Sequence, residues 1–535
     1  MKIWALAAIA CFSVLRTIPL PAYAGDCESL SRSNLANSTI TTAQTISTGN
    51  FTSPYGDAID KLSSFCRVAG VIEPSSDSYI RFEVWLPANW NGKYLGVGNG
   101  GFAGSIGYKS LANNVNHGYA TAGTDTGHQA EAGDASWAFH HSEKITDFGY
   151  RALHLTTVNA KSLMKEFYSR SPQHSYFASC SDGGREALME AQRFPSDFDG
   201  ILAGAPANFW THLVAGGVVT AQALTGNPAA YISSLKMPAI NKAALGACDA
   251  QDGVKDGIIN DPFRCRFDPS VLRCKDVDSL TCLTSPQITA LERIYAGSRN
   301  SAGARIFPGF MPGSEDGWGL WVIGFAPGGS FGYLYVENYF RYMVFDDPAW
   351  EILHASADEV EKAADEKTAH ALNATDPNLH SFHARGGKLI LYHGWNDPAI
   401  SPVNTINYYE SVLKTMGGVA TSESVRLYMV PGMAHCSSGP GPNSFGQSGP
   451  GAVDSPQASI YSALEHWVEK GAPPDQIIAK KYVEDNPSKA LVMSRPLCPY
   501  PQVAKYKGFG DTNDASSFTC TVASALAAGI SSFAK

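Results

Sequence analysis

The sequence predicts an α/β fold built on a mostly parallel sheet, with a long insertion between two of its strands. Short apolar strands alternate with helical patterns at both ends of the chain, which indicates βαβ units with parallel strands. From about residue 208 to about residue 380 the pattern breaks into turn residues, paired cysteines and clustered aromatic residues. We therefore expect an α/β domain in two parts, 25–207 and 381–535, with a lid domain, 208–380, inserted between them.

The elements of the first part follow from local patterns. Tyr79–Pro87 alternates in β fashion, and Lys93–Gly104 indicates a buried strand that runs into a glycine loop. Gly118–Gly127 indicates a short strand that ends in turn residues, whereas Ile145–Tyr168 has the spacing of a helix. Residues 29–53 are rich in Ser, Thr and Asn, which favours a loop.

The following elements carry the candidate site. Phe177–Pro195, "FASCSDGGREALMEAQRFP", predicts a strand, a turn of small residues and a helix, and Phe198–Pro206 predicts the next strand. After the insertion, Lys388–Pro398 and Val425–Cys436 each predict a strand followed by a loop, and a helix is expected around Ala458–Lys470.

The composition indicates a globular protein with a sizeable core. Hydrophobic residues make up 44% of the 535 positions and charged residues only 17%. The formal net charge is −9, and the chain has no run of Lys or Arg, which argues against nucleic acid as its main partner. The composition does not indicate an oligomeric state.

The N-terminus and the cysteines indicate export. Lys2, an apolar stretch and "AYA" at Ala22–Ala24 are typical of a cleaved signal peptide, 1–24. The alternative is a membrane anchor, but Arg16 and Pro19 interrupt a stretch already short for a span, and no later window is long enough. Of the 11 cysteines, ten follow this segment, an even number that suits disulfides. We expect a secreted or periplasmic protein without a membrane span after cleavage.

Ser181 lies in the turn between the strand and the helix of the stretch quoted above. A nucleophilic serine needs such a sharp turn, which small neighbours permit, as in the G-x-S-x-G elbow. Here Ser179 replaces the first glycine and Gly183 is the second. The alternative is a serine that caps the helix.

Asp397 and His435 complete a candidate triad. Each follows a predicted strand, and the chain order Ser, Asp, His is that of α/β-hydrolases. The alternatives are a turn-forming Asp and a surface histidine. In the triad, Ser181 attacks the acyl carbon, His435 moves the proton, and Asp397 fixes the tautomer of His435. The oxyanion donors are expected to be the Asp182 N–H and an N–H of the "GNGGFAG" loop, at Gly101 or Gly100.

With these motifs the chain resembles the tannase/feruloyl esterase family of secreted α/β-hydrolases, which includes mono(2-hydroxyethyl) terephthalate hydrolase. The matching marks are "CS" at Cys180-Ser181, "GWNDP" around Asp397 and "HC" at His435-Cys436. The resemblance covers nearly the whole mature chain. It implies the α/β-hydrolase fold, and it implies a disulfide between Cys180 and Cys436 that ties the turn of the nucleophile to the loop of the base. The alternative for Cys180 is a buried hydrophobe or a free thiol.

The lid domain contains a candidate calcium loop. Asp249, Asp252 and Asp256 stand within eight residues, among glycines, and hard oxygen ligands suit Ca²⁺. The alternative is a solvated acidic turn. The resemblance implies these three carboxylates and the carbonyls of Val254 and Ile258 as ligands of a structural calcium. It also implies four further disulfides: Cys27–Cys66, Cys248–Cys265, Cys274–Cys282 and Cys498–Cys520.

Residues 305–350 are rich in aromatic side chains, which occupy 13 of these 46 positions. Most are expected to form the core of the lid, and a few to line a slot for an aromatic acyl group. The set includes Trp318, Trp321, Phe325, Tyr333 and Tyr339. The predicted function is therefore hydrolysis of aromatic acid esters (feruloyl, galloyl or terephthaloyl) through an acyl-enzyme. The alternatives are a general esterase or peptidase of the same fold, and a non-catalytic binding protein.

Overall fold

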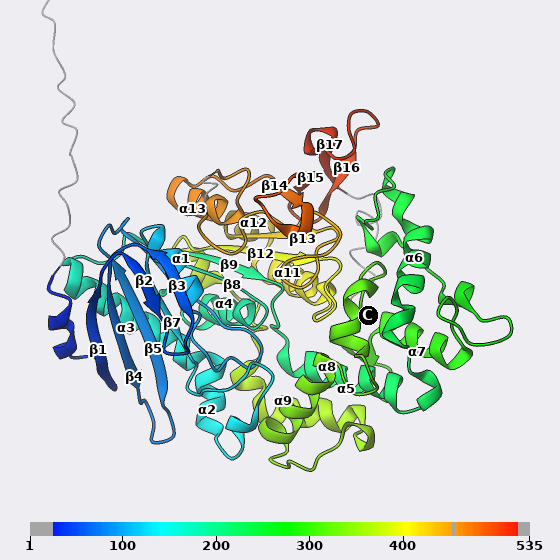
Figure 1. The fold of residues 1–535 in the computed structure, drawn as a ribbon, viewed down its shortest axis with the longest axis horizontal. Coiled ribbons are helices and arrows are strands. Elements are labelled where there is room, and N and C mark those ends of the chain that lie inside the picture. The colour runs from blue at the N-terminus through cyan, green and yellow to red at the C-terminus, as the bar shows by residue number, and fades with distance from the viewer. Residues whose placement is uncertain (1–24, 452–454, 523–535) are drawn as a thin grey trace, which may run out of the picture.

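The fold is described from a computed structural model, over residues 25–451 and 455–522. Its centre is a nine-stranded sheet (Figure 1). The strands, in spatial order, are β1 (Ser38–Ile46), β4 (Phe65–Ile72), β5 (Ile80–Pro87), β7 (Ala120–Thr124), β6 (Lys93–Val97), β8 (His174–Cys180), β9 (Gly200–Gly204), β12 (Lys388–Gly394) and β13 (Val425–Val430). From β7 to β13 all neighbours are parallel, and only the edge formed by β1, β4 and β5 is antiparallel. The predicted mostly parallel sheet is confirmed. The predicted signal peptide, 1–24, lies outside the described residues.

Helices cover both faces of this sheet. The flanking helices are α1 (Tyr108–Asn116), α3 (Ala152–Tyr168), α4 (Asp182–Arg193), α11 (Pro402–Met416), α12 (Gly418–Ser424) and α13 (Ile460–Lys470). On β9, Ile201 and Ala203 pack with α3, α4 and α11, whereas Leu202 between them packs with α13. Because successive strand residues point to opposite faces, the sheet is sandwiched between two helical layers.

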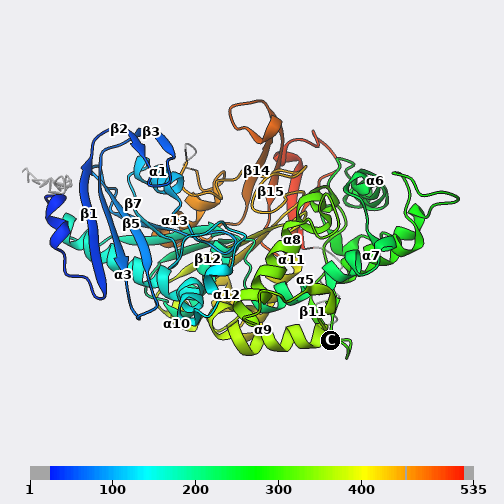
Figure 2. The same cartoon turned by 60° about the horizontal axis from the view of Figure 1, so that its bottom comes forward.

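The insertion predicted from the sequence leaves the sheet after β9 and returns at β12. These two strands are hydrogen-bonded neighbours, so the whole segment, 205–387, is one excursion from the sheet. It contains α5 (Trp210–Thr225), α6 (Met237–Cys248), α7 (Ser285–Ala296), α8 (Phe331–Asn338), α9 (Ala357–Leu372), α10 (His380–Ala384) and the hairpin of β10 (Ser298–Arg299) and β11 (Arg305–Phe307). Its helices α5 to α9 lie on the side of the molecule away from β1 (Figures 1 and 2), whereas α10 packs against the core of the sheet through Phe382.

Smaller elements complete the fold. They are the hairpin of β2 (Gly49–Thr52) and β3 (Ala58–Leu62), helix α2 (Ser142–Thr146), the pair β14 (Ile477–Tyr482) and β15 (Leu491–Leu497), and the pair β16 (Gln502–Tyr506) and β17 (Phe518–Val522). No helix among the described residues is long and apolar enough to cross a bilayer.

Two predictions from local pattern were wrong. The segment 29–53 is not a loop, because it contains most of a short 3₁₀ helix, the edge strand β1 and β2. Threonine and isoleucine at its centre favour a strand, and an edge strand needs few fully buried residues. The single helix expected over Ile145–Tyr168 is divided by a π-helical turn at Asp147–Arg151. The apolar spacing continues through that turn and therefore does not reveal it.

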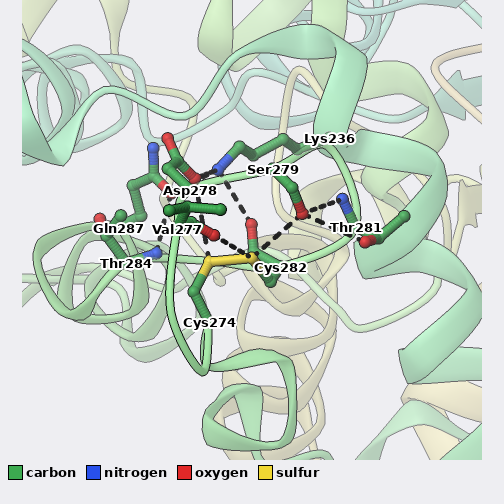
Figure 3. Close-up of a disulfide and its surroundings, with 9 residues drawn as sticks. All are labelled: Lys236, Cys274, Val277, Asp278, Ser279, Thr281, Cys282, Thr284 and Gln287. Carbon is green, nitrogen blue, oxygen red and sulfur yellow. Dashed lines mark hydrogen bonds and ion pairs between the residues drawn. A yellow bond between two sulfur atoms is a disulfide. The ribbon is translucent and has the colours of Figure 1, made fainter.

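The ten cysteines of the described chain form the five disulfides implied by the resemblance. One of them, Cys274–Cys282, closes a short loop of the insertion (Figure 3). The buried Lys236 ammonium holds this loop through the Asp278 carboxylate and the Cys282 carbonyl at 2.9 Å, and it also donates to the Gln287 amide oxygen of α7 at 2.8 Å. The loop is therefore fixed by a covalent bond and by a cation.

Candidate active site

Ser181 occupies a strained turn at the carboxyl end of β8. Its φ of 68° and ψ of −122° are rare for a residue with a side chain, and α4 begins at the next residue. A Cβ on Gly183 would lie 1.9 Å from the Ser179 hydroxyl oxygen, so this position requires glycine. Ser179 thus fills the space that the first glycine of the elbow would leave empty.

Asp397 and His435 meet at the carboxyl ends of β12 and β13. The Asp397 Oδ2 atom lies 2.7 Å from His435 Nδ1, and the carboxylate is fully buried. Its Oδ1 accepts the N–H groups of Ala399 at 2.8 Å and Ile400 at 2.9 Å. Because Nδ1 faces a carboxylate it carries the proton, which leaves Nε2 free to accept one.

A second histidine, His393, supports Asp397 from behind. Its Nε2 lies 3.0 Å from Asp397 Oδ2 and 3.1 Å from the Ile400 carbonyl, two acceptors that require the proton at Nε2. Burial alone raises the pKa of Asp397, but the charge and hydrogen bonds of His435 and His393 outweigh it and hold that pKa well below its usual range. Asp397 is therefore ionised wherever His435 acts as a base. The sequence analysis missed His393, which lies inside a predicted strand.

The disulfide Cys180–Cys436 joins the residue before Ser181 to the residue after His435. The two Cα atoms are 6.0 Å apart, although the cysteines are 256 positions apart in the chain. Cys436, like Ser181, has a positive φ, of 62°. The bridge thus fixes two strained turns, one carrying each side chain, beside each other.

Removing this bridge is expected to impair both stability and turnover. The loss of chain entropy in the unfolded state predicts that a disulfide closing so long a loop stabilises the fold by about 5 kcal/mol. The variant Cys180→Ala/Cys436→Ala should therefore unfold at a markedly lower denaturant concentration, and its kcat should fall. The matched control is Cys27→Ala/Cys66→Ala, which removes a bridge at the far edge of the sheet and should lower stability while sparing kcat of the folded enzyme. Denaturant unfolding and kcat measurements decide this. An unchanged kcat in the first variant would contradict the positioning role.

The two residues expected to supply the oxyanion donors line the same cavity as Ser181. Asp182 and Gly101 both line it, and within the described residues neither N–H donates a hydrogen bond. Gly101 has a φ of 62°, and a Cβ there would lie 2.4 Å from the Ala132 carbonyl oxygen. Gly100, the other candidate, does not line the cavity. The pair Asp182 and Gly101 is therefore the donor pair that the geometry favours.

Further residues that the sequence analysis missed hold the glycine loop against α4. The Glu186 carboxylate accepts the Asn99 N–H at 2.8 Å, and the Asn99 carbonyl accepts the Gly183 N–H at 2.9 Å. Burial, followed by the charge of Asp182, raises the pKa of Glu186 to about 8. On the other side His128 Nε2 lies 2.7 Å from the Phe102 carbonyl, and burial lowers the pKa of this histidine to about 4. These hydrogen bonds join the glycine loop to the segment that carries Ser181.

The cavity that contains these groups has a volume of about 170 Å³ and extends into the inserted segment. Trp321 lies edge-on to His435, with ring centroids 5.4 Å apart, and is parallel to Tyr335. Of the aromatic residues singled out in the sequence, Trp321 and Tyr333 line the cavity. Trp318 and Tyr339 are instead fully buried in the core, and Phe325 is 79% exposed.

The lining is almost free of charge. Among the described residues that line the cavity, Asp182 is the only acidic residue and His435 the only basic one. The Asp182 carboxylate turns away to the buried guanidinium of Arg185, whose Nε lies 2.7 Å from Oδ1. A ligand in this cavity therefore meets aromatic and aliphatic surface with no lysine or arginine.

The candidate calcium loop folds against the C-terminal strands. Burial, followed by the charges of Asp256 and Asp249, raises the pKa of Asp252 to about 6. The Asp249 carboxylate accepts the N–H groups of Asp256 and Gly257, each at 3.1 Å. Arg495 provides one cation, 2.6 Å from the Asp256 carboxylate. The carbonyls of Val254 and Ile258 accept no hydrogen bond from the described residues. This all-oxygen set fits a hard divalent cation.

Comparisons with known proteins agree with the geometry. A family model described as tannase and feruloyl esterase matches residues 66–521. An uncharacterized esterase of Xanthomonas campestris is 44% identical over 92% of this chain and 91% of its own, and a probable feruloyl esterase B-2 of Aspergillus flavus is 35% identical over 84% and 87%. The crystal structure of feruloyl esterase B from Aspergillus oryzae superposes with a TM-score of 0.86 at 31% identity, over 92% of this chain and 99% of that one. The chain therefore belongs to the tannase and feruloyl esterase family of α/β-hydrolases and is a carboxylic ester hydrolase.

Proposed function

We propose that the protein is a serine esterase that cleaves esters of aromatic acids through an acyl-enzyme. The observation that carries this proposal is the buried Asp397–His435 hydrogen bond beside a cavity that also holds Ser181 and two unpaired backbone N–H groups. Ser181 attacks the acyl carbon while His435 Nε2 takes its proton. The N–H groups of Asp182 and Gly101 stabilise the oxyanion, and His435 then returns the proton to the leaving alcohol.

The acyl group is proposed to be an aromatic acid without a charge on its ring. A cavity of about 170 Å³ is close to the size that holds benzene in an engineered protein core, about 150 Å³. Trp321 and Tyr335 offer ring faces and edges to a planar group. The lining supplies no cation, which favours a hydroxycinnamoyl group over a terephthaloyl monoester with its free carboxylate.

A matched pair of substrates tests this assignment. Dimethyl terephthalate and monomethyl terephthalate share one ring and one leaving alcohol and differ in a single charge. Burying an unpaired carboxylate costs several kcal/mol, so kcat/KM for the monoester is expected to be at least about 100-fold lower. The kcat/KM for methyl ferulate should exceed that for methyl hexanoate. Equal rates within the terephthalate pair would show that the acyl group stays in solvent, and equal rates for ferulate and hexanoate would rule out the aromatic slot.

A structural calcium in the 249–258 loop is the second part of the proposal. Asp249, Asp252, Asp256 and the carbonyls of Val254 and Ile258 would hold it, and it would fix this loop of the insertion, whose Asp256 pairs with Arg495 of the C-terminal strands. No catalytic step needs it. Chelation by EGTA is expected to lower Tm by a few degrees, because saturation at 100 times Kd contributes about 2.7 kcal/mol. Added Ca²⁺ should restore Tm in the wild type and have no effect on Asp252→Asn. If neither EGTA nor added Ca²⁺ changes the Tm of the wild type, the loop does not bind calcium.

The proposed location is secreted or periplasmic, and the proposed partner is a small aromatic ester. Five disulfides in one chain support an oxidising compartment, because cytosolic thiols are kept reduced. An acidic net charge of −9 supports a role without nucleic acid.

A further inference from the structure

A second cluster of ionisable groups lies at the far end of α4 from Ser181. His154 of α3, Glu190 of α4 and Asp197, just before β9, place their potential ligand atoms within 4.8 Å of one another. Glu190 follows Ser181 by nine residues, which corresponds to about 13 Å along a helix. None of the three lines the substrate cavity, so the triad chemistry does not account for them.

The Glu190 side chain is buried beside the Asp197 carboxylate. It is 1% exposed, and neither of its oxygens accepts a hydrogen bond from the described residues. A buried carboxylate in this state is costly unless a proton or a cation compensates for it. Burial, and after it the adjacent Asp197 carboxylate, raises the pKa of Glu190 well above its ordinary value. The cluster thus contains two carboxyl groups for which a shared proton or a bound cation is more favourable than two negative charges.

The other polar groups nearby do not satisfy Glu190. His154 Nδ1 is engaged with Asp197 Oδ2 at 2.6 Å. The Lys161 ammonium donates to the main-chain carbonyls of Asp197 and Ser196 and to neither carboxylate. The positive charge of Lys161 lowers the pKa of Glu190, but without a hydrogen bond between the two side chains.

We propose that His154, Glu190 and Asp197 bind a divalent transition-metal ion, with Zn²⁺ as the best match. Zn²⁺ accepts His nitrogen and Asp or Glu oxygen as ligands, and a water molecule would complete a four-coordinate shell here. The two carboxylates balance the charge of the ion. The hydrogen bond between His154 and Asp197 would be replaced by one coordination bond from the ion to His154 and one to Asp197. The ion would join α3, α4 and the entry to β9, and its role is structural.

The environment of His154 suits a ligand. Its ring stacks on Phe194, with centroids 3.7 Å apart, which fixes its orientation. Its side chain is 26% exposed, so an ion can enter from solvent past this residue. The one other cluster of three such residues among those described, Cys274, Asp278 and Cys282, offers no thiolates, because its cysteines form a disulfide.

The test is zinc titration of the full mature enzyme, stripped with EDTA and then kept in excess Ca²⁺ so that the 249–258 loop stays loaded. Calorimetry and Tm should show one Zn²⁺ per chain and a rise in Tm. Glu190→Gln and His154→Gln should each lower the affinity by about tenfold or more, since each removes a ligand. Glu166→Gln, which removes an exposed carboxylate of the same helix α3, should bind as the wild type does.

The outcomes separate the alternatives. Zinc that binds equally to the wild type and to both ligand variants lies on surface histidines, and this result would overturn the proposal. Failure of the wild type to bind one Zn²⁺ per chain would overturn the proposal too. If Glu190→Gln then has a higher Tm than the wild type, Glu190 and Asp197 share a proton and bind no metal. If Glu190→Gln fails to fold, the half-buried His154→Gln variant decides alone.

Discussion

Ser181→Ala is expected to lower kcat by at least about 10⁴-fold, with little change in KM or Tm. The substitution removes the attacking oxygen, and losses of this size follow removal of the nucleophile from a serine triad. The residual rate would come from the oxyanion donors and from substrate binding, which the variant keeps. The measurement is kcat on methyl ferulate, with the folded fraction determined by Tm.

Ser179→Ala is the matched control for this variant. Ser179 lies two residues before Ser181, at the end of β8, but it does not line the cavity and its hydroxyl fills the space beside Gly183. Its loss should therefore change kcat only slightly. If Ser181→Ala retained a rate within tenfold of the wild type, Ser181 would not be the nucleophile.

Asp397→Asn is expected to lower kcat by about 10⁴-fold while the fold persists. The carboxylate accepts hydrogen bonds from two histidines through one oxygen. An amide group in its place can present N–H to His435 Nδ1, which selects the tautomer with Nε2 protonated and unable to accept a proton from serine. The steady-state kcat and its dependence on pH measure this effect.

His393→Gln provides the comparison for Asp397→Asn. It removes one donor to Asp397 but keeps the carboxylate and the His435 hydrogen bond, so a loss of about tenfold is expected. A larger loss in His393→Gln than in Asp397→Asn would reverse the roles of the two residues.

The sequence predicts most of the parallel sheet, because each strand there carries its own apolar signal and is bounded by turn residues. It also places the residues of the proposed triad, since Ser181, Asp397 and His435 each follow such a strand in one chain order. β1 was missed because its threonine-rich composition resembles that of a loop, and only pairing with β4 makes it a strand. Local composition therefore does not predict a strand whose formation depends on pairing with another strand of the chain.

The same limit applies to the site. His393 is indistinguishable from a core residue of its strand until Asp397 is seen beside it. The hydrogen bond between Glu186 and Asn99 joins positions 87 apart, and no local pattern indicates it. The richness in aromatic residues of 305–350 predicts an apolar insertion but does not separate Trp321, which faces His435, from the buried Trp318.

The most direct test of the account is to label the enzyme with a fluorophosphonate and to locate the adduct by fragmentation of the peptide that contains residues 177–195. We expect one adduct per chain, on the Ser181 oxygen. It should be retained in Ser179→Ala, form more slowly in Asp397→Asn and be absent from Ser181→Ala. An adduct on another serine, or full labelling of Ser181→Ala, would contradict it.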